Sequence, residues 1–150
     1  MNEDEKWMRI AINEANLAEA KGEVPVGSVI IHNHQIIAKA HNSPIINNDP
    51  TAHAEIIAIR KAGKKQRNYR LPDTTLYVTL EPCIMCLGAI IHARINRVVY
   101  GALDPKAGFC SSSNNLNSNI FFNHQIIFKG GILEQECKKI IKTFFKTRRR

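Results

Sequence analysis

Two short stretches of the chain carry side chains that can bind a metal ion and move a proton. One is His53-Ala54-Glu55, and the other, Pro82-Cys83-Ile84-Met85-Cys86, follows after 26 intervening residues. One imidazole and two thiolates are ligands that zinc accepts, and a catalytic zinc keeps its fourth position for water. The carboxylate of Glu55 would then be free to carry protons. The two stretches therefore predict a catalytic site with one zinc ion per chain, held by His53, Cys83 and Cys86.

Each stretch is expected at the start of a helix. Pro82 is favoured as a first helical residue. Cys83 and Cys86, three positions apart, would share one helix face near the positive end of the dipole, where thiolates are stabilised. His53 and Glu55 are two positions apart, so they would converge only in a first turn, with the metal beyond the helix end. The segment 49–51, Asp-Pro-Thr, is a helix-start signal that supports this arrangement.

Other interpretations fit each motif taken alone. A single C-x-x-C motif also occurs in redox and structural sites, and H-x-E by itself is weak evidence. A structural zinc usually has four protein ligands, and no second C-x-x-C or H-x-x-x-H pair completes such a set here. Glu55 could also be a first-turn carboxylate that the helix dipole favours. The conjunction of the two motifs is far more specific, because it is the signature of the zinc-dependent deaminases.

The sequence around these motifs resembles the bacterial tRNA-specific adenosine deaminases. The similarity runs from about Trp7 to Arg149 and is carried by Glu23-Val24-Pro25-Val26-Gly27, His41-Asn42, residues 49–55, 76–83 and 97–101, Asn123-His124 and Phe144-Phe145. The zinc motifs are shared with cytidine, guanine and other deaminases, whereas the flanking stretches resemble the tRNA enzymes. The chain departs from the family in having Ser28 after Pro-Val-Gly, and three serines at 111–113 in place of Gly-Ser-Leu.

The resemblance also implies substrate contacts outside the metal ligands. It implies that the Asn42 side chain hydrogen-bonds the nucleoside and that the backbone N–H groups of Ala54 and Cys83 contact the base edge. It also implies that the Asp104 carboxylate lies near the ribose and that Val26 and Phe145 line an anticodon-loop groove. From the residues alone, Asn42 and Asp104 are equally ordinary turn or cap residues. Val26 and the phenylalanine pair can also be core residues.

Hydrolytic deamination would use these groups in a definite way. Zinc lowers the pKa of its bound water from about 16 to about 7, which makes hydroxide available at neutral pH. The hydroxide attacks the amino-bearing ring carbon, which is C6 in adenine. Glu55 is the acid in the motif, so we expect it to carry a proton from the water to N1 and then to the departing ammonia. Such acid–base assistance contributes roughly 10² to 10⁴ in rate.

Composition points to a single domain with an anionic partner. The chain has 150 residues, 44% of them hydrophobic, and we expect one zinc-dependent deaminase domain over residues 1–150. A net charge of +8 favours nucleic acid over a membrane surface as the partner. The acidic first residues contain no secretory or transit signal, and the longest apolar run, 83–91, is too short to cross a bilayer. We therefore expect a cytoplasmic protein, with Cys110 and Cys137 as unpaired thiols.

Two basic clusters bear on the substrate. The first has six Lys or Arg residues between positions 60 and 70 and is equally interpretable as a solvated face. The second is a basic C-terminal helix and tail at about 134–150, in which seven of the last thirteen residues are Lys or Arg. Lys146, Arg148 and Arg149 would suit contacts to an RNA backbone. A tRNA anticodon stem-loop is the expected partner, because its loop bases are unpaired and are extruded at low cost.

The hydrophobic pattern predicts alternating helices and strands. Helices are expected at 2–21, at 52–61 with a stop at Gly63, from 82 to about 92, and from 133 to about 145. Strands are expected at 24–31, 35–40, 74–79, 97–100 and 126–129, and residues 103–123 read as a loop with room for one helical turn. Strands followed by crossover helices favour parallel pairing. The resemblance implies a three-layer α/β/α sandwich with a five-stranded mixed sheet, the cytidine-deaminase-like fold, and a homodimer with each active site near the subunit interface.

Three functions are compatible with these observations. The first is deamination of the wobble adenosine of a tRNA anticodon loop to inosine. The second is deamination of a free base or nucleoside such as guanine or cytidine, against which the basic tail, Asn42 and Asp104 argue. The third is a zinc-stabilised RNA-binding module without catalysis, against which the intact Glu55 argues.

Overall fold

A five-stranded mixed sheet forms the centre of the molecule, as the resemblance implies. The structure is a computed structural model and describes residues 2–110 and 125–148. The strands are β1 (Gly27–His32), β2 (Gln35–His41), β3 (Thr74–Leu80), β4 (Arg97–Ala102) and β5 (Ile127–Lys129). They lie in the order β2-β1-β3-β4-β5. Pairing is antiparallel between β1 and its neighbours β2 and β3, and parallel along β3, β4 and β5.

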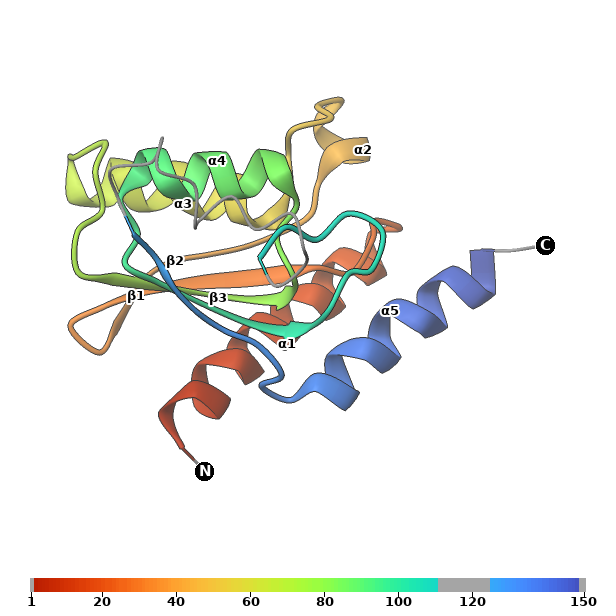
Figure 1. Cartoon of the computed structure of the whole chain (residues 1–150). Coiled ribbons are helices and arrows are strands. Elements are labelled where there is room, and N and C mark those ends of the chain that lie inside the picture. Colours follow the sequence, from red (N-terminus) through yellow and green to blue (C-terminus); the bar gives the residue numbers. More distant parts are fainter. Residues whose placement is uncertain (1, 111–124, 149–150) are drawn as a thin grey trace.

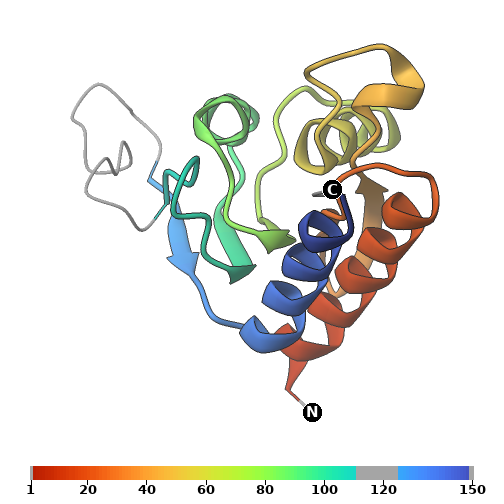
Figure 2. The ribbon, with the colours of Figure 1, turned by 90° about the vertical axis from the view of Figure 1, so that its right-hand side faces the viewer.

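Helices cover both faces of this sheet. They are α1 (Glu3–Ala20), α2 (Pro44–Asn47), α3 (Ala54–Gln66), α4 (Ile84–Ala93) and α5 (Glu134–Arg148). Figure 1 shows α3 and α4 on one face and α1 and α5 on the other. Figure 2 shows α1 and α5 side by side, and an Arg9–Glu136 ion pair of 2.9 Å joins them. This confirms the predicted three-layer α/β/α sandwich.

Strand periodicity explains why both faces are covered. Successive side chains of a strand point to opposite faces of the sheet. Leu76 and Val98 accordingly join the core beneath α3 and α4, whereas Tyr77 and Val99 join the core beneath α1. The strands are therefore apolar on both sides, which a sheet tolerates only between two helical layers.

The first helix, predicted at 2–21, spans Glu3–Ala20. Asn2 and Glu5 form a reciprocal capping box at its N-terminus, and Gly22 follows its end with a φ of 80°. Where α1 crosses β1, a Cβ atom on Gly27 would collide with the carbonyl oxygen of Ala11. Glycine at position 27 thus allows the helix to lie directly on the strand.

Several helix boundaries differ from the prediction. The helix predicted at 52–61 starts at Ala54 and passes through Gly63 to Gln66. It ends because Arg67 adopts the left-handed conformation (φ 53°), while the N–H of Asn68 donates to the carbonyl of Gly63. The last helix continues to Arg148, three residues beyond the predicted Phe145. The short helix α2 was not predicted.

Three strands deliver the chain to the same edge of the sheet. Because β1 is antiparallel to β2 and β3, and β4 is parallel to β3, the strands β2, β3 and β4 run in one direction. Asn42, Glu81 and Leu103 directly follow their last residues. Helices α3 and α4 also begin at this end (Figure 1). The carboxyl ends of such strands are the usual place for a site in an α/β sheet.

Two further expectations concern membranes and thiols. Across residues 2–110 and 125–148, no helix combines the length and the apolar composition that a membrane span requires. Cys110 and Cys137 are buried free thiols, as predicted. Burial raises the pKa of Cys137 to about 12 and also raises that of Cys110. Residues 111–113 and 123–124 of the sequence analysis, and Arg149, lie outside the described residues.

Candidate active site

The three predicted metal ligands lie together at the starts of two helices. His53 is the N-cap of α3, Cys83 is the N-cap of α4, and Cys86 lies in the first turn of α4. The Nδ1 atom of His53 is 3.8 Å from Sγ of Cys83 and 3.6 Å from Sγ of Cys86. All three donor atoms lie within 4.8 Å of one another. The pairing of motifs that are 30 residues apart is therefore confirmed as a spatial cluster.

Pro82 does not begin the helix, contrary to the prediction. Its carbonyl oxygen accepts a hydrogen bond of 3.0 Å from the N–H of Phe109, and Cys83 pairs with Gly108 in an isolated bridge. These contacts hold Cys83 extended, with φ −79° and ψ 176°. The N-cap side chain of α4 and the Cys86 side chain one turn later still converge, because the N-cap side chain folds back toward the first turn.

The spacing of the donor atoms fits zinc. With Zn–S near 2.3 Å, Zn–N near 2.1 Å and tetrahedral angles, a ligating sulfur and nitrogen are about 3.6 Å apart. The two sulfur–nitrogen distances of 3.6 and 3.8 Å match this value. Within the described part of the chain, no fourth His, Cys, Asp or Glu joins the group. Three protein ligands are the set of a catalytic zinc rather than a closed structural one.

The two thiols have opposite tendencies to ionise. A hydrogen bond from Cys86, together with the adjacent His53, lowers the pKa of Cys83 to about 4. That shared hydrogen bond and burial raise the pKa of Cys86. Two sulfurs this close ionise together only when a cation lies between them, so metal binding would release the second proton.

Glu55 is a buried carboxyl group in the first turn of α3. Glu55 is 4% exposed, and burial raises the pKa of its carboxyl group to about 7. The nearby Cys83 sulfur adds to this rise, and His53 opposes it. A carboxyl group that titrates near neutral pH can both accept and return a proton. Glu55 therefore has the properties of a proton carrier.

A pocket of about 580 Å³ opens over these groups. This volume lies in the range of small-molecule sites, roughly 300–1,000 Å³. Seven residues singled out in the sequence line it: Val26, Asn42, His53, Glu55, Cys83, Asp104 and Phe145. Its other lining residues, which the sequence analysis did not assign, are Val24, Pro44, Leu80, Glu81, Leu103, Pro105, Lys106, Ala107 and Ile141. Most of these could not be found by motif, since they are apolar or lie in loops.

The predicted polar contacts have specific partners in the structure. The N–H of Ala54 donates to Oδ1 of Asn42 at 2.8 Å, so this N–H is directed at a side chain of the pocket wall. The amide nitrogen of Asn42 is then its group available to donate to a ligand. Oδ1 of Asp104 accepts hydrogen bonds from the N–H groups of Lys106 and Ala107, at 3.1 and 3.2 Å. The roles of Ala54, Asn42 and Asp104 toward a substrate stay predictions.

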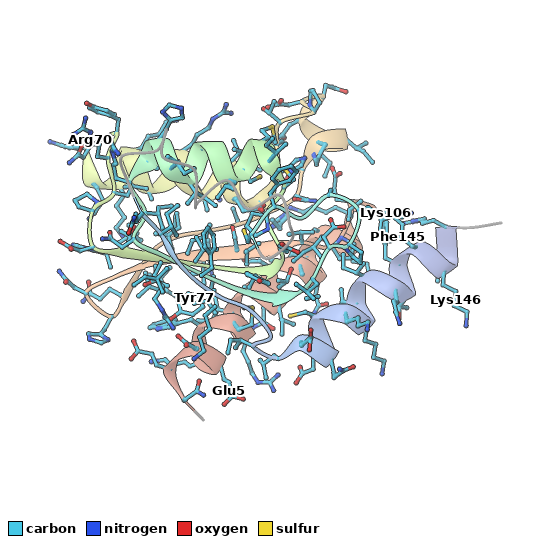
Figure 3. The ribbon with its side chains drawn as sticks, in the orientation of Figure 1. Glu5, Arg70, Tyr77, Lys106, Phe145 and Lys146 are labelled. Atoms are coloured by element: carbon cyan, nitrogen blue, oxygen red, sulfur yellow. The ribbon has the colours of Figure 1, made fainter. Side chains whose placement is uncertain are left out.

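The phenylalanine pair divides its roles. Phe144 is buried, and the Arg148 guanidinium lies over its ring at 4.9 Å. Phe145 is 43% exposed and lines the pocket. Figure 3 shows Phe145 and Lys106 at the same end of the molecule. Val26 is both buried and part of the pocket lining.

The two basic clusters differ in their relation to the pocket. Lys142 and Lys146 of α5 line a shallow depression that shares Phe145 and Ile141 with the pocket. Arg70, in the first cluster, lies at the other end of the molecule (Figure 3). Within that cluster, Arg60 lies 4.0 Å from Asp49, and Lys61 donates to a β2 carbonyl at 3.1 Å. The C-terminal helix is thus the basic element beside the pocket.

Comparisons with known proteins agree with this site. Residues 1–102 match the family model of the cytidine and deoxycytidylate deaminase zinc-binding region. A tRNA-specific adenosine deaminase from Haemophilus influenzae is 49% identical over 147 residues, covering 97% of this chain and 85% of that protein.

Two solved structures extend the comparison to three dimensions. One comes from studies of A-to-I editing by tRNA:A34 deaminases at the wobble position of transfer RNA. It matches with a TM-score of 0.87 and 42% identity over 90% of this chain and 98% of that one. The other is a guanine deaminase from Bacillus subtilis, with a TM-score of 0.65 and 45% identity over 69% of this chain and 66% of that one.

Proposed function

We propose that this chain, which belongs to the cytidine and deoxycytidylate deaminase family and within it to the tRNA-specific adenosine deaminases, converts the wobble adenosine of a tRNA anticodon loop to inosine. The observation that carries the proposal is that a buried carboxyl group with a pKa near 7 lines one pocket together with His53 and Cys83, two residues of the His53–Cys83–Cys86 cluster. Metal ligands beside a buried proton carrier support hydrolysis at a ring carbon rather than RNA binding alone.

The residues of the pocket account for each proton that moves. When zinc is bound by His53, Cys83 and Cys86, it supplies a water that is activated for attack at neutral pH. Glu55 takes one proton from that water and delivers it to N1 of the base, which lets the C6–O bond form without charge accumulating in the ring. Glu55 then takes the remaining proton from the new C6 hydroxyl group and gives it to the amino group, so that the C6–N bond breaks, the C6 carbonyl forms and ammonia leaves. Asn42 and Asp104 orient the nucleoside from the pocket wall.

The surface beside the pocket suits RNA. Lys142 and Lys146 lie next to the exposed ring of Phe145 on α5, and Lys106 lies on the pocket rim. Lysines bind backbone phosphates, and an aromatic ring stacks on an unpaired base, which contributes about 1–3 kcal/mol per base. A free nucleoside has no phosphate for such a face to bind.

The same proposal includes a homodimer in the cytoplasm. Large apolar side chains are exposed on α2 and at the start of α4: Ile45 (69%), Ile46 (53%) and Ile84 (53%). Both elements lie at the pocket end of the molecule (Figure 1), so a second copy covering them would lie near the active site. Sedimentation of the protein with and without Ile84→Glu tests this, and an unchanged monomer in both would contradict the homodimer.

A second candidate function is deamination of a free purine base. The 45% identity to a guanine deaminase over 69% of this chain favours it. That similarity supports a site that accepts a free base. Lys142 and Lys146 of α5 distinguish the two candidates, because a free base has no phosphate for these lysines to bind.

Sequencing for adenosine-to-inosine changes after incubation with total tRNA tests the proposed function. A parallel assay compares an anticodon stem-loop with free adenosine, cytidine and guanine at matched concentrations. We expect conversion of the wobble adenosine and no turnover of the free compounds. Turnover of a free base without turnover of the stem-loop would establish the second candidate instead.

A further inference from the structure

Two buried carboxylates at the pocket are not used by the proton transfers described above. Glu23 is 1% exposed and Glu81 is 4% exposed. A carboxylate this deeply buried is stable only with strong hydrogen-bond donors around it. Glu81 also lines the pocket, and Glu23 directly precedes Val24, which lines it as well.

Glu23 holds the segment that follows β2. Its Oε1 accepts a hydrogen bond from the N–H of Ile45 at 3.2 Å, and its Oε2 accepts one from the N–H of Ile46 at 2.8 Å. The first N–H groups of a helical turn have no partner within that turn, so the carboxylate satisfies them. This segment contains Asn42 and Pro44, which line the pocket. Glu23 thereby fastens one wall of the pocket to the chain before β1.

Glu81 holds the segment that follows β4. Its Oε1 accepts a hydrogen bond from the N–H of Asp104 at 3.1 Å, and its Oε2 accepts one from the N–H of Cys110 at 2.8 Å. A Cβ atom on Gly108 would collide with the same carboxylate, so the loop packs directly on it. Residues 103–107 of this loop all line the pocket.

These segments are the two sides of one pocket. In the sheet, β2 and β4 are separated by β1 and β3, so the chain leaves the pocket edge at two separate points. The two carboxylates lie next to the two intervening strands, since Glu23 precedes β1 and Glu81 directly follows β3. Each carboxylate therefore reaches outward to one wall.

We propose that Glu23 and Glu81 are positioning residues that hold the two walls at the spacing in which a single nucleoside fits. They act on substrate binding and not on proton transfer. The inference rests on the proposed function for the identity of the nucleoside. The hydrogen bonds that it invokes can be tested without any substrate.

The test uses Glu23→Gln and Glu81→Gln in the full-length protein with zinc. Glutamine keeps the side-chain size but removes the charge and one of the two acceptors. Loss of a charge-assisted hydrogen bond, about 1.5 kcal/mol, corresponds to roughly tenfold faster exchange of the backbone amide hydrogens it protects. We expect this at Ile45 and Ile46 in the first variant and at Asp104 and Cys110 in the second. The KM for the stem-loop should rise by roughly tenfold, with kcat changed less and zinc content unchanged.

Asp4→Asn is the matched control, since it also removes a largely buried carboxylate but one remote from the pocket. It should lower the melting temperature without raising KM or loosening the four wall amides. Wall amides that keep their protection in the Gln variants would overturn the proposal, as would an equal rise of KM in Asp4→Asn. If the Gln variants do not fold, Glu23→Asp and Glu81→Asp keep the charge and take the same measurements. If the stem-loop is not a substrate, the amide exchange still decides for or against the two clamps, and only the proposed function fails.

Discussion

Glu55 and Asp4 are both carboxyl groups removed from water, yet they lie near opposite ends of β4 and in contrasting surroundings. Asp4 receives hydrogen bonds from Arg97 at 2.8 and 2.9 Å, from Tyr77 at 2.7 Å and from Lys129 at 3.0 Å. These contacts, led by Arg97, hold the pKa of Asp4 well below its usual range. Glu55 instead lies where burial dominates, which raises its pKa to about 7.

The contrast separates a structural carboxylate from a reactive one. Asp4 joins α1 to β4 and to β5, so its charge is fully used in the folded state. Tyr77, labelled in Figure 3 away from Phe145, belongs to this structural end, and burial raises its pKa. A carboxyl group whose pKa lies far below neutral stays ionised at pH 7 and is a poor proton carrier, whereas Glu55 can both accept and release a proton. Five experiments separate the groups that serve the pocket from those at the structural end, beginning with the largest expected effect.

Removing a metal ligand should have the largest effect. We expect about one zinc per chain in the purified protein, and loss of most of it, together with activity, in Cys83→Ala or Cys86→Ala. Because metal binding contributes to folding, these variants should also melt at lower temperature. Metal analysis and thermal melts make the measurement, and full zinc retention in both variants would refute the ligand assignment.

Glu55→Ala should abolish deamination while zinc and RNA binding persist. Loss of a general acid–base group costs roughly 10²- to 10⁴-fold in kcat, and the loss of both proton transfers places this variant at the upper end. Single-turnover assays with stem-loop RNA, alongside metal analysis, measure it. Activity within tenfold of the wild type would remove Glu55 from the mechanism, and parallel loss of zinc would make it a ligand.

Asp4→Asn should lower stability without affecting chemistry. Loss of its charge-assisted hydrogen bonds should cost about 2 kcal/mol in the free energy of unfolding. Its pKa is depressed in the folded state from an ordinary value of 3.8. Its contribution is therefore present above pH 4 and is lost as the pH falls further. Denaturant titrations at pH 7 and below pH 4 should show the wild-type advantage shrinking in acid, and a constant advantage would contradict this account.

Gly108→Ala should mimic Glu81→Gln, because the added Cβ would displace the Glu81 carboxylate. We expect a similar rise in KM, roughly tenfold, and little further rise in the double variant, since both changes release the same loop. Steady-state kinetics with stem-loop RNA on both single variants and the double variant provide the cycle. Additive effects would show that the two residues act independently.

Truncation after Phe145 should have the smallest effect. It removes Lys146 and the terminal arginines but keeps Phe145, and each lost phosphate contact reduces the salt slope of log K by about 0.7–0.9. RNA binding measured between low and moderate salt should weaken and depend less on salt, with zinc content unchanged. An unchanged salt slope would show that the basic tail does not contact the RNA backbone.

The sequence was sufficient for those parts of the site that rest on local motifs. His53, Glu55, Cys83 and Cys86 could be identified because their types and spacing are restrictive. Strands followed by crossover helices predicted parallel pairing, whereas the three layers and the five-stranded mixed sheet were implied by the resemblance. The start of α4 could not be predicted, because long-range contacts of Cys83 and Pro82 with the 108–109 segment prevent Pro82 from joining the helix. The end of α3 could not be predicted either, because no residue type in the sequence signals the left-handed conformation of Arg67.

The buried carboxylates show a different limit of the sequence. Glu23 and Glu81 look like ordinary surface residues until their backbone partners, 22 to 29 positions away, are known. The same holds for Asn42, whose side chain accepts from Ala54, 12 positions later. Hydrogen bonds from side chain to distant backbone have no pattern of residue types, because every non-proline residue offers the same N–H group.

The chain separations of these contacts also bear on the order of assembly during synthesis. His53 and Cys86 are 33 residues apart, whereas Asp4 is 93 residues from Arg97 and 125 from Lys129. A chain made from its N-terminus therefore presents all three metal ligands before either cationic partner of Asp4 exists. Helix α1, although first to leave the ribosome, cannot complete its anchorage until β4 and β5 have been made. The first helix to be synthesised is thus among the last to complete its tertiary contacts.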